Sequence, residues 1–227
     1  MNATPPTTLL LIHGFASSFE HGWRQNGWVD IVADFGCDAP SIDLPGHGTS
    51  QTSSDPADYE DVPEALFSSL PGTPPYDAVG FSIGAQQLLR MAIAHPASFN
   101  RIVLMGLGDS VFDTASTDLI IDALEADTDP DDVQLRLFRR LATTTGSDID
   151  SLVAFLRRPR PELTDEMLAR VSCPVLLVIG ERDEPAPTRL AACLPDAAVV
   201  TLPGVDHFST PQDFGAIDAT MRFFGLG

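Results

Sequence analysis

The sequence predicts an α/β fold with a doubly wound, mainly parallel sheet of about six strands. Three observations lead to this fold class. Short apolar runs recur along the 227 residues, segments with helical periodicity separate most of them, and one long helical segment carries no strand. Apolar runs that alternate with helices are typical of a parallel sheet that is covered on both faces.

The apolar runs are the expected strands. The first of them, residues 8–12, has the sequence "TLLLI" and meets a turn at Gly14. A short, continuously apolar run that ends near glycine indicates a buried strand rather than an amphipathic one. The other strands are expected at residues 39–43 (the weakest), 77–81, 101–106, 174–180 and 197–202.

Helical periodicity accounts for most of the chain between these runs. Leu88, Met91 and Ala92, for example, recur at the spacing of one helix face. Helices are expected at residues 23–35, 60–70, 83–95, 188–194 and 211–224. Between Asp109 and Val171 several helical pieces follow one another without a strand, each opening near Asp or Thr. We therefore expect a helical excursion above the sheet here.

Composition limits the location and the partners of the protein. Acidic residues number 32 against 13 basic ones, a formal net charge of −19, and a field of that sign disfavours nucleic acid and anionic membranes as partners. The chain has no apolar stretch long enough to cross a bilayer and opens without the features of a signal peptide. A cytoplasmic protein is therefore expected, with Cys37, Cys173 and Cys193 reduced and without a disulfide or zinc site.

One hydroxyl stands out in the stretch "AVGFSIGAQ", residues 78–86. A strand that ends at Phe81 and a helix that begins at Ile83 leave Ser82 on a sharp turn at the carboxyl edge of the sheet, and the flanking glycines let strand and helix pass closely. The motif alone also fits a plain turn serine, because G-x-S-x-G occurs by chance in about one chain in ten of this length. The strand-turn-helix context favours a nucleophile.

A nucleophilic serine needs a base and an acid that orients the base. Of the five histidines, His207 is the expected base, because it follows the last strand and completes the chain order Ser, Asp/Glu, His. Asp183, just after the strand at 174–180, is the expected acid, and Asp109 is the competing candidate because it also follows a strand. His13 is better explained as a structural turn residue.

The oxyanion that forms in such a reaction needs fixed donors. One is the backbone N–H of Ile83, at the start of the helix after the serine, with the helix dipole behind it. The second is expected from the loop "HGFAS" after the first strand, where Gly14 lets the chain turn and aim the N–H of Phe15 inward. Ala16 is the alternative donor in this loop.

Five segments cover nearly the whole chain outside residues 109–171: "LLLIHGF", "DLPGHGTS", "VGFSIGA", "CPVLLVIGERD" and "PGVDHF". In these motifs and their order the chain resembles the serine hydrolases of the α/β-hydrolase fold. The resemblance implies acyl transfer to Ser82, with His207 as base, Asp183 as orienting acid and the oxyanion donors named above. It implies no metal and no organic cofactor.

The resemblance also implies a division of the chain into a hydrolase core, residues 1–108 and 172–227, and a helical lid, residues 109–171, that shapes the acyl pocket. Most members of the family carry an antiparallel hairpin before the strand that leads into the His-Gly turn, and only seven residues precede that strand here. We therefore expect a shortened, all-parallel sheet of six strands. An uncovered edge strand is compatible with a monomer or a homodimer.

The expected reaction is hydrolysis of a small or medium, largely apolar carboxylic ester, with no partner beyond this small-molecule substrate. A lactone, thioester or carbon–carbon bond hydrolase is the alternative, and a non-catalytic binding protein of the same fold is the hypothesis from another class. Six arginines lie in the predicted lid: Arg136, Arg139, Arg140, Arg157, Arg158 and Arg160. We expect solvated ion pairs there, and the sharper hypothesis is that these arginines attract an anionic substrate or an acidic carrier domain.

Overall fold

The computed structural model of the protein describes residues 7–113, 115–183 and 185–226. Six strands form one sheet in which every neighbouring pair is parallel. Their spatial order is β2 (Cys37–Asp38), β1 (Thr7–Ile12), β3 (Tyr76–Phe81), β4 (Phe99–Met105), β5 (Val175–Gly180) and β6 (Ala197–Leu202). The predicted parallel α/β sheet of about six strands is confirmed.

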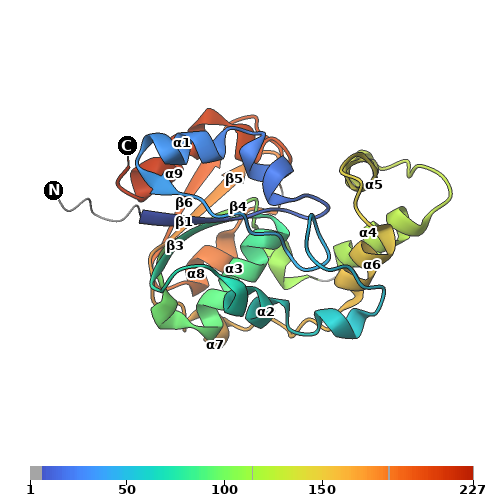
Figure 1. The fold of residues 1–227 in the computed structure, drawn as a ribbon, viewed down its shortest axis with the longest axis horizontal. Coiled ribbons are helices and arrows are strands. Elements are labelled where there is room, and N and C mark those ends of the chain that lie inside the picture. The colour runs from blue at the N-terminus through green and yellow to red at the C-terminus, as the bar shows by residue number, and fades with distance from the viewer. Residues whose placement is uncertain (1–6, 114, 184, 227) are drawn as a thin grey trace.

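Helices cover both faces of this sheet, as Figure 1 shows. The helices α1 (Trp28–Asp34) and α9 (Phe214–Phe223) lie on one face. The other face is covered by α2 (Val62–Ser69), α3 (Ile83–Ala94) and α8 (Thr188–Cys193). None of the helices in the described ranges combines the length and the apolar character that a membrane span requires.

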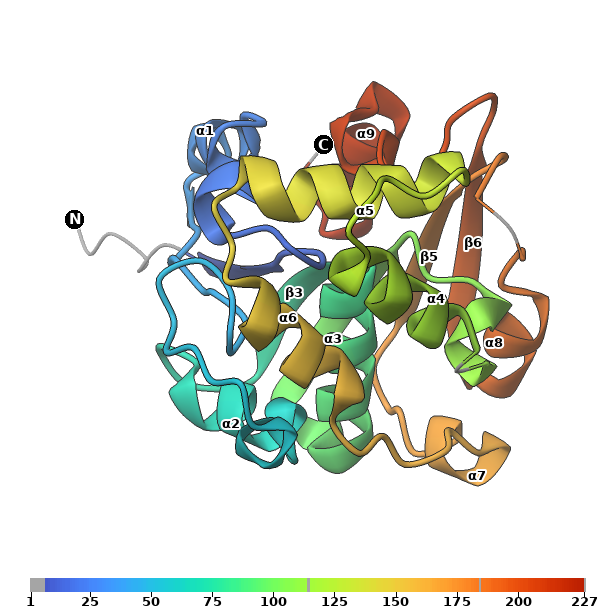
Figure 2. The ribbon, with the colours of Figure 1, turned by 90° about the vertical axis from the view of Figure 1, so that its right-hand side faces the viewer.

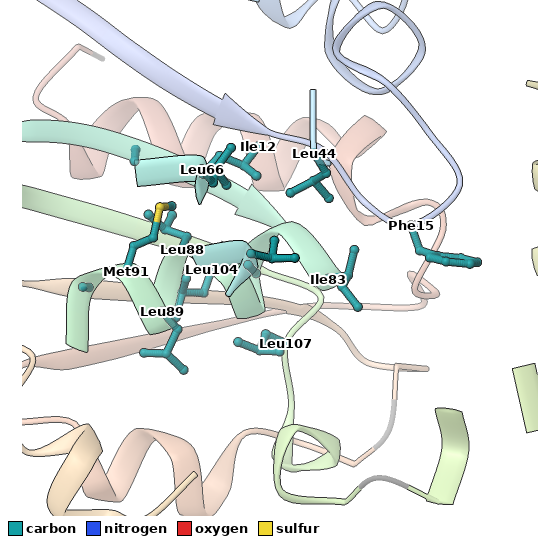
Figure 3. Close-up of a cluster of buried hydrophobic side chains, with 14 of the residues drawn as sticks. Ile12, Phe15, Leu44, Leu66, Ile83, Leu88, Leu89, Met91, Leu104 and Leu107 are labelled. Carbon is teal, nitrogen blue, oxygen red and sulfur yellow. The ribbon is translucent and has the colours of Figure 1, made fainter. Parts of the chain in front are cut away.

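The core consists of two layers of apolar side chains, one on each face of the sheet. Successive residues of β1 alternate between them: Leu9 and Leu11 belong to the layer under α1 and α9, and Leu10 and Ile12 belong to the layer under α2 and α3. Figure 3 shows part of the second layer, which includes Ile12 of β1 and Leu88, Leu89 and Met91 of α3. Because both faces are buried, each central strand carries a continuous apolar run, which is why these strands could be located from the sequence.

The strand expected at residues 39–43 is absent at that position, and a shorter one, β2, precedes it. Pro40 cannot donate a hydrogen bond to a neighbouring strand, so pairing ends before it. Asp43 instead binds backbone groups of two loops through its side chain. Its carboxylate accepts hydrogen bonds from the backbone N–H of Phe19 at 2.7 Å and of Thr49 at 2.8 Å.

The helix expected at residues 23–35 is divided into two pieces. A π-helical turn, η1 (Glu20–Arg24), ends before Gly27, which has a left-handed φ of 81° and precedes α1. Glycine adopts this conformation without steric cost, and the chain changes direction there. The last expected helix, 211–224, likewise separates into the 3₁₀ turn η5 (Thr210–Gln212) and α9.

Between β4 and β5 the described residues form helices and turns and no strand. These elements are η4 (Asp109–Phe112), α4 (Ala115–Glu125), α5 (Val133–Thr144), α6 (Ile149–Arg157) and α7 (Asp165–Leu168). Two other 3₁₀ turns precede β4: η2 (Pro56–Tyr59) and η3 (Pro96–Ser98). Figures 1 and 2 show that α4, α5 and α6 lie beyond the carboxyl edge of the sheet. Asp132 and Asp148 cap α5 and α6, as the sequence predicts.

Candidate active site

Ser82 occupies the turn between β3 and α3 with a backbone φ of 54° and ψ of −118°. A positive φ is unfavourable for a residue that carries a side chain, and such residues cluster at functional sites. The conformation is maintained by the neighbouring strand, because the Ser82 N–H donates a hydrogen bond to the carbonyl oxygen of Met105 at 2.8 Å. The turn leaves the hydroxyl at the carboxyl edge of the sheet.

Two glycines make this turn possible. A Cβ atom on Gly80 would lie 2.7 Å from Cα of Ala85, and one on Gly84 would collide with the carbonyl oxygens of Ile12 and His13. The start of α3 therefore approaches both β3 and the end of β1 more closely than any side chain allows. The glycine spacing in the motif follows from this close packing.

The structure brings Ser82, His207 and Asp183 together in one hydrogen-bonded row. His207 Nε2 lies 3.0 Å from Ser82 Oγ, and His207 Nδ1 lies 2.8 Å from Asp183 Oδ2. A carboxylate only accepts hydrogen bonds, so the imidazole proton belongs on Nδ1 and the Nε2 lone pair faces the serine hydroxyl. This is the arrangement in which a histidine can remove a proton from serine.

The competing acid, Asp109, has a different position. Its carboxylate accepts hydrogen bonds from the backbone N–H of Arg189 and of Leu190, both at 2.9 Å. These are N–H groups of the first turn of α8, which have no partner within the helix. Asp109 therefore caps α8.

His13 directly follows β1 and links the loop after this strand to the loop at Leu44. Its side chain is fully buried, Nδ1 donates to the carbonyl oxygen of Gly14 at 2.8 Å, and Nε2 accepts the N–H of Leu44 at 3.0 Å. Burial lowers the pKa of His13, against the smaller raising effects of the Gly14 carbonyl and Asp43. A neutral ring satisfied at both nitrogens fits the structural role expected for it.

Phe15 and Ile83, whose backbone N–H groups are the expected oxyanion donors, both line a cavity at Ser82. Phe15 lies on the loop after β1 and Ile83 is the first residue of α3, as Figure 3 shows. Neither N–H donates a hydrogen bond within the part of the chain that the structure describes. The loop is constrained at its next residue, because Ala16 has a φ of 51° and its carbonyl oxygen accepts a hydrogen bond from Thr145 Oγ1 at 3.0 Å.

The cleft at Ser82 consists of two cavities of about 220 and 190 Å³. Both are lined by Ser82 and His207 and by the aromatic rings of Phe15, Phe138 and Phe208. Phe138 belongs to α5, and its ring centroid lies 6.1 Å from that of Phe15 and 5.1 Å from that of Phe208. The helix α5 thus places an aromatic side chain over the cleft. The sequence of α5 does not show whether Phe138 lines a cleft or only packs in the core.

Two residues of the cleft, Gln86 and Trp23, escaped the sequence-based prediction, and Arg160 was expected only as a member of the group of arginines within residues 109–171. Gln86 and Arg160 line the smaller cavity, and Trp23 lines the larger one, where its indole N–H is buried without a hydrogen-bond partner. Of Gln86 and Trp23, only Gln86 has a position in the sequence that could have indicated the site, since it lies one helical turn after Ser82. Among the described residues, no group of three or more His, Cys, Asp or Glu side chains could hold a metal ion.

Known proteins resemble this chain over most of its length. It is 26% identical over 238 residues to the pimeloyl-[acyl-carrier protein] methyl ester esterase of Nitrosomonas europaea, an alignment that covers 86% of this chain and 90% of that protein. It is also 26% identical to the dihydrolipoyllysine-residue acetyltransferase component of the acetoin cleaving system of Pseudomonas putida, covering 96% of this chain but only 63% of that relative.

Solved structures share the fold at low sequence identity. A hydrolase from Pseudomonas aeruginosa PA01 has a TM-score of 0.72 at 18% identity and covers 99% of this chain and 92% of its own. A carboxylesterase structure from Nitrososphaera gargenis has a TM-score of 0.68 at 18% identity, with coverages of 97% and 90%. The family model described as the alpha/beta hydrolase family matches residues 9–217. The chain therefore belongs to the alpha/beta hydrolase family.

Proposed function

We propose that the protein is a serine hydrolase that cleaves a small or medium carboxylic ester through an acyl-enzyme on Ser82. The observation that carries the proposal is the row of hydrogen bonds, 3.0 Å and 2.8 Å long, from Ser82 through His207 to Asp183. The name of the Nitrosomonas relative, a methyl ester esterase, supports an ester as the substrate. A lactone or a thioester presents the same carbonyl to the same residues.

In the proposed mechanism, Ser82 Oγ attacks the ester carbonyl carbon while His207 Nε2 takes the hydroxyl proton. Asp183 stabilises the imidazolium and keeps the ring in place. The carbonyl oxygen becomes negatively charged and accepts hydrogen bonds from the N–H groups of Phe15 and Ile83, donors fixed before the reaction.

The tetrahedral intermediate then expels the alcohol, which takes the proton from His207 and leaves the acyl group on Ser82. A water molecule gives a proton to His207 Nε2 and attacks the acyl carbon. Collapse of this second intermediate returns the proton to Ser82 and releases the carboxylic acid. Residues 109–171 act as the lid in this proposal, because Phe138 of α5 lies over both cavities of the cleft.

The test is labelling with a fluorophosphonate probe, followed by intact-mass measurement and peptide mapping of the wild type, Ser82→Ala and His207→Ala. We expect one adduct, on Ser82, that Ser82→Ala abolishes and His207→Ala slows strongly. Hydrolysis of p-nitrophenyl esters should fall by about 10³-fold or more in both variants. A folded wild type that neither takes up the probe nor cleaves any ester would refute the proposal and favour a non-catalytic binding protein.

A further inference from the structure

A further cavity of about 670 Å³ is lined by four arginines: the exposed Arg170 and three that are less exposed. Arg90 comes from α3, and Arg158 and Arg160 come from the loop that follows α6. The guanidinium of Arg90 donates a hydrogen bond to the carbonyl oxygen of Pro161 at 2.9 Å, which ties α3 to this loop. Figure 2 shows the loop leaving α6 toward α7. We refer to Arg90, Arg158 and Arg160 as the arginine cluster.

The arginine cluster has no ion-pair partner among the described residues. Other arginines between β4 and β5 do form ion pairs. Arg139 lies 3.5 Å from Asp129, and Arg157 lies 2.9 Å from Glu125. With 32 acidic residues against 13 arginines, counter-charges are abundant in this protein. Four other described arginines also lack an ion pair, but all four are exposed to solvent: Arg136, Arg140, Arg170 and Arg182. The arginine cluster differs from them because its members are partly or fully buried.

Arg158 is the most buried member, with 5% of its surface exposed. Its guanidinium donates to the carbonyl oxygen of Phe155 and lies 3.9 Å from the centroid of the Phe155 ring. These contacts hold the side chain in place but carry no negative charge, and a buried charge without a counter-charge is costly. Burial, together with the charges of Arg160 and Arg90, lowers the pKa of Arg158 to about 9.

The two carboxylates on this cavity do not neutralise the cluster. Asp61 caps α2, where its side chain accepts the N–H of Glu64 at 3.2 Å, and neither Asp61 nor Glu60 lies within ion-pair distance of an arginine. Asp118 favours the charged form of Arg160 without forming an ion pair. The cavity therefore keeps a net positive character inside an acidic protein, which suits an oxyanion.

Arg160 connects this cavity to the candidate active site. It lines the 670 Å³ cavity with Arg158, and it also lines the 190 Å³ cavity with Ser82 and His207. Its guanidinium donates to Thr117 Oγ1 at 2.9 Å, and Thr117 lines the smaller cavity too. An acyl chain attached to Ser82 that extends along this cavity approaches the cluster.

We propose that the arginine cluster binds an oxyanion at the far end of the substrate's acyl group, so that the preferred ester carries a terminal carboxylate or phosphate. This inference rests on the proposed hydrolase function. Arginine binds both kinds of oxyanion through paired N–H donors. Carboxylate and phosphate therefore share the chemistry of the site, and the experiment separates them.

The kinetic test compares three p-nitrophenyl esters with matched acyl chains: octanoate, the half-ester of suberic acid, and an ω-phosphonooctanoate. For the wild type we expect KM to be about tenfold or more lower for at least one anionic ester than for the neutral one, at similar kcat. Arg90→Gln and Arg158→Met should each raise that KM about tenfold and leave the neutral ester unchanged. Arg157→Gln, which removes the neighbouring surface arginine, is the matched control and should keep the preference.

A binding test on Ser82→Ala separates failure of this inference from failure of the proposed function. Suberate or inorganic phosphate should raise the Tm of Ser82→Ala and leave that of Ser82→Ala/Arg158→Met unchanged. Equal KM changes for neutral and anionic esters, or equal Tm shifts with and without Arg158, would overturn the inference even if the protein is an active esterase. Binding that depends on Arg158 in a protein inert toward all esters would retain the anion site and reject the esterase.

Discussion

Acidification is expected to destabilise the protein through His47, a buried histidine of the loop between β2 and α2. Its side chain is 1% exposed. Nδ1 donates to the carbonyl oxygen of Pro45 at 3.0 Å, and Nε2 is buried without a partner. The ring lies between those of Phe155 and Phe15, at centroid distances of 4.9 and 5.6 Å. A proton added to Nε2 would therefore create a buried charge and an unsatisfied donor.

Burial is the main cause that lowers the pKa of His47 to about 3. The neighbouring His13 and Arg158 side chains act in the same direction, and the Pro45 carbonyl and Asp43 act against them. In the unfolded chain the pKa is about 6.5. The unfolded state thus binds the proton first, so stability is intact above pH 6.5 and is lost as the pH falls toward 3. The slope is about 1.4 kcal/mol per pH unit well below pH 6.5, and the loss between pH 7 and 5 is about 2 kcal/mol.

The assay is urea unfolding followed by circular dichroism at pH 7, 6 and 5 for the wild type and His47→Phe. Phenylalanine keeps a ring against Phe15 and Phe155 but binds no proton. The difference in the free energy of unfolding between the two proteins should shift by about 2 kcal/mol in favour of the variant between pH 7 and 5. The exposed His21, replaced by Asn, serves as the control. Parallel pH profiles of the wild type and His47→Phe would refute the reasoning.

Two further predictions concern residues that lie around the candidate active site. Asp109→Asn should weaken the cap of α8, so that the free energy of unfolding falls by about 1 kcal/mol while kcat/KM is retained. Asp183→Asn should instead lower kcat by roughly 10⁴-fold. A comparable loss of kcat in both variants would contradict the assignment of Asp183 as the acid. Gly84→Ala should cost about 1–3 kcal/mol in urea unfolding, because its methyl group would meet the carbonyl oxygens of Ile12 and His13, and wild-type stability would show that the turn relaxes.

The strands of the sheet were predictable where burial on both faces made them apolar throughout, as in β5, where every residue is buried. The edge strand β2 was not, because only two residues pair and one of them is exposed. Helix boundaries depend on the backbone conformation of single residues, which the periodicity of apolar residues does not indicate. The left-handed Gly27, which divides the segment expected as one helix, is the main example.

Ser82, Asp183 and His207 could be proposed together because the order of a parallel sheet brings the carboxyl ends of its strands to one edge. The choice between Asp183 and Asp109 could not be made with the same force. Both follow a strand, and sequence position does not show where the chain turns afterwards. In the structure the 3₁₀ turn η4 carries Asp109 to the first turn of α8, whereas Asp183 faces His207.

The arginines show most clearly what composition leaves undecided. The expectation of solvated ion pairs holds for Arg157 but not for its neighbour Arg158. Pro159 disfavours a helical conformation at the preceding residue, and Arg158 accordingly leaves α6 with a φ of −55° and a ψ of 150°. That single change of backbone direction separates a surface arginine from one buried beside the cavity. A local signal was thus present, in the proline after two arginines, but its consequence depends on α3 lying alongside, where Arg90 completes the cluster.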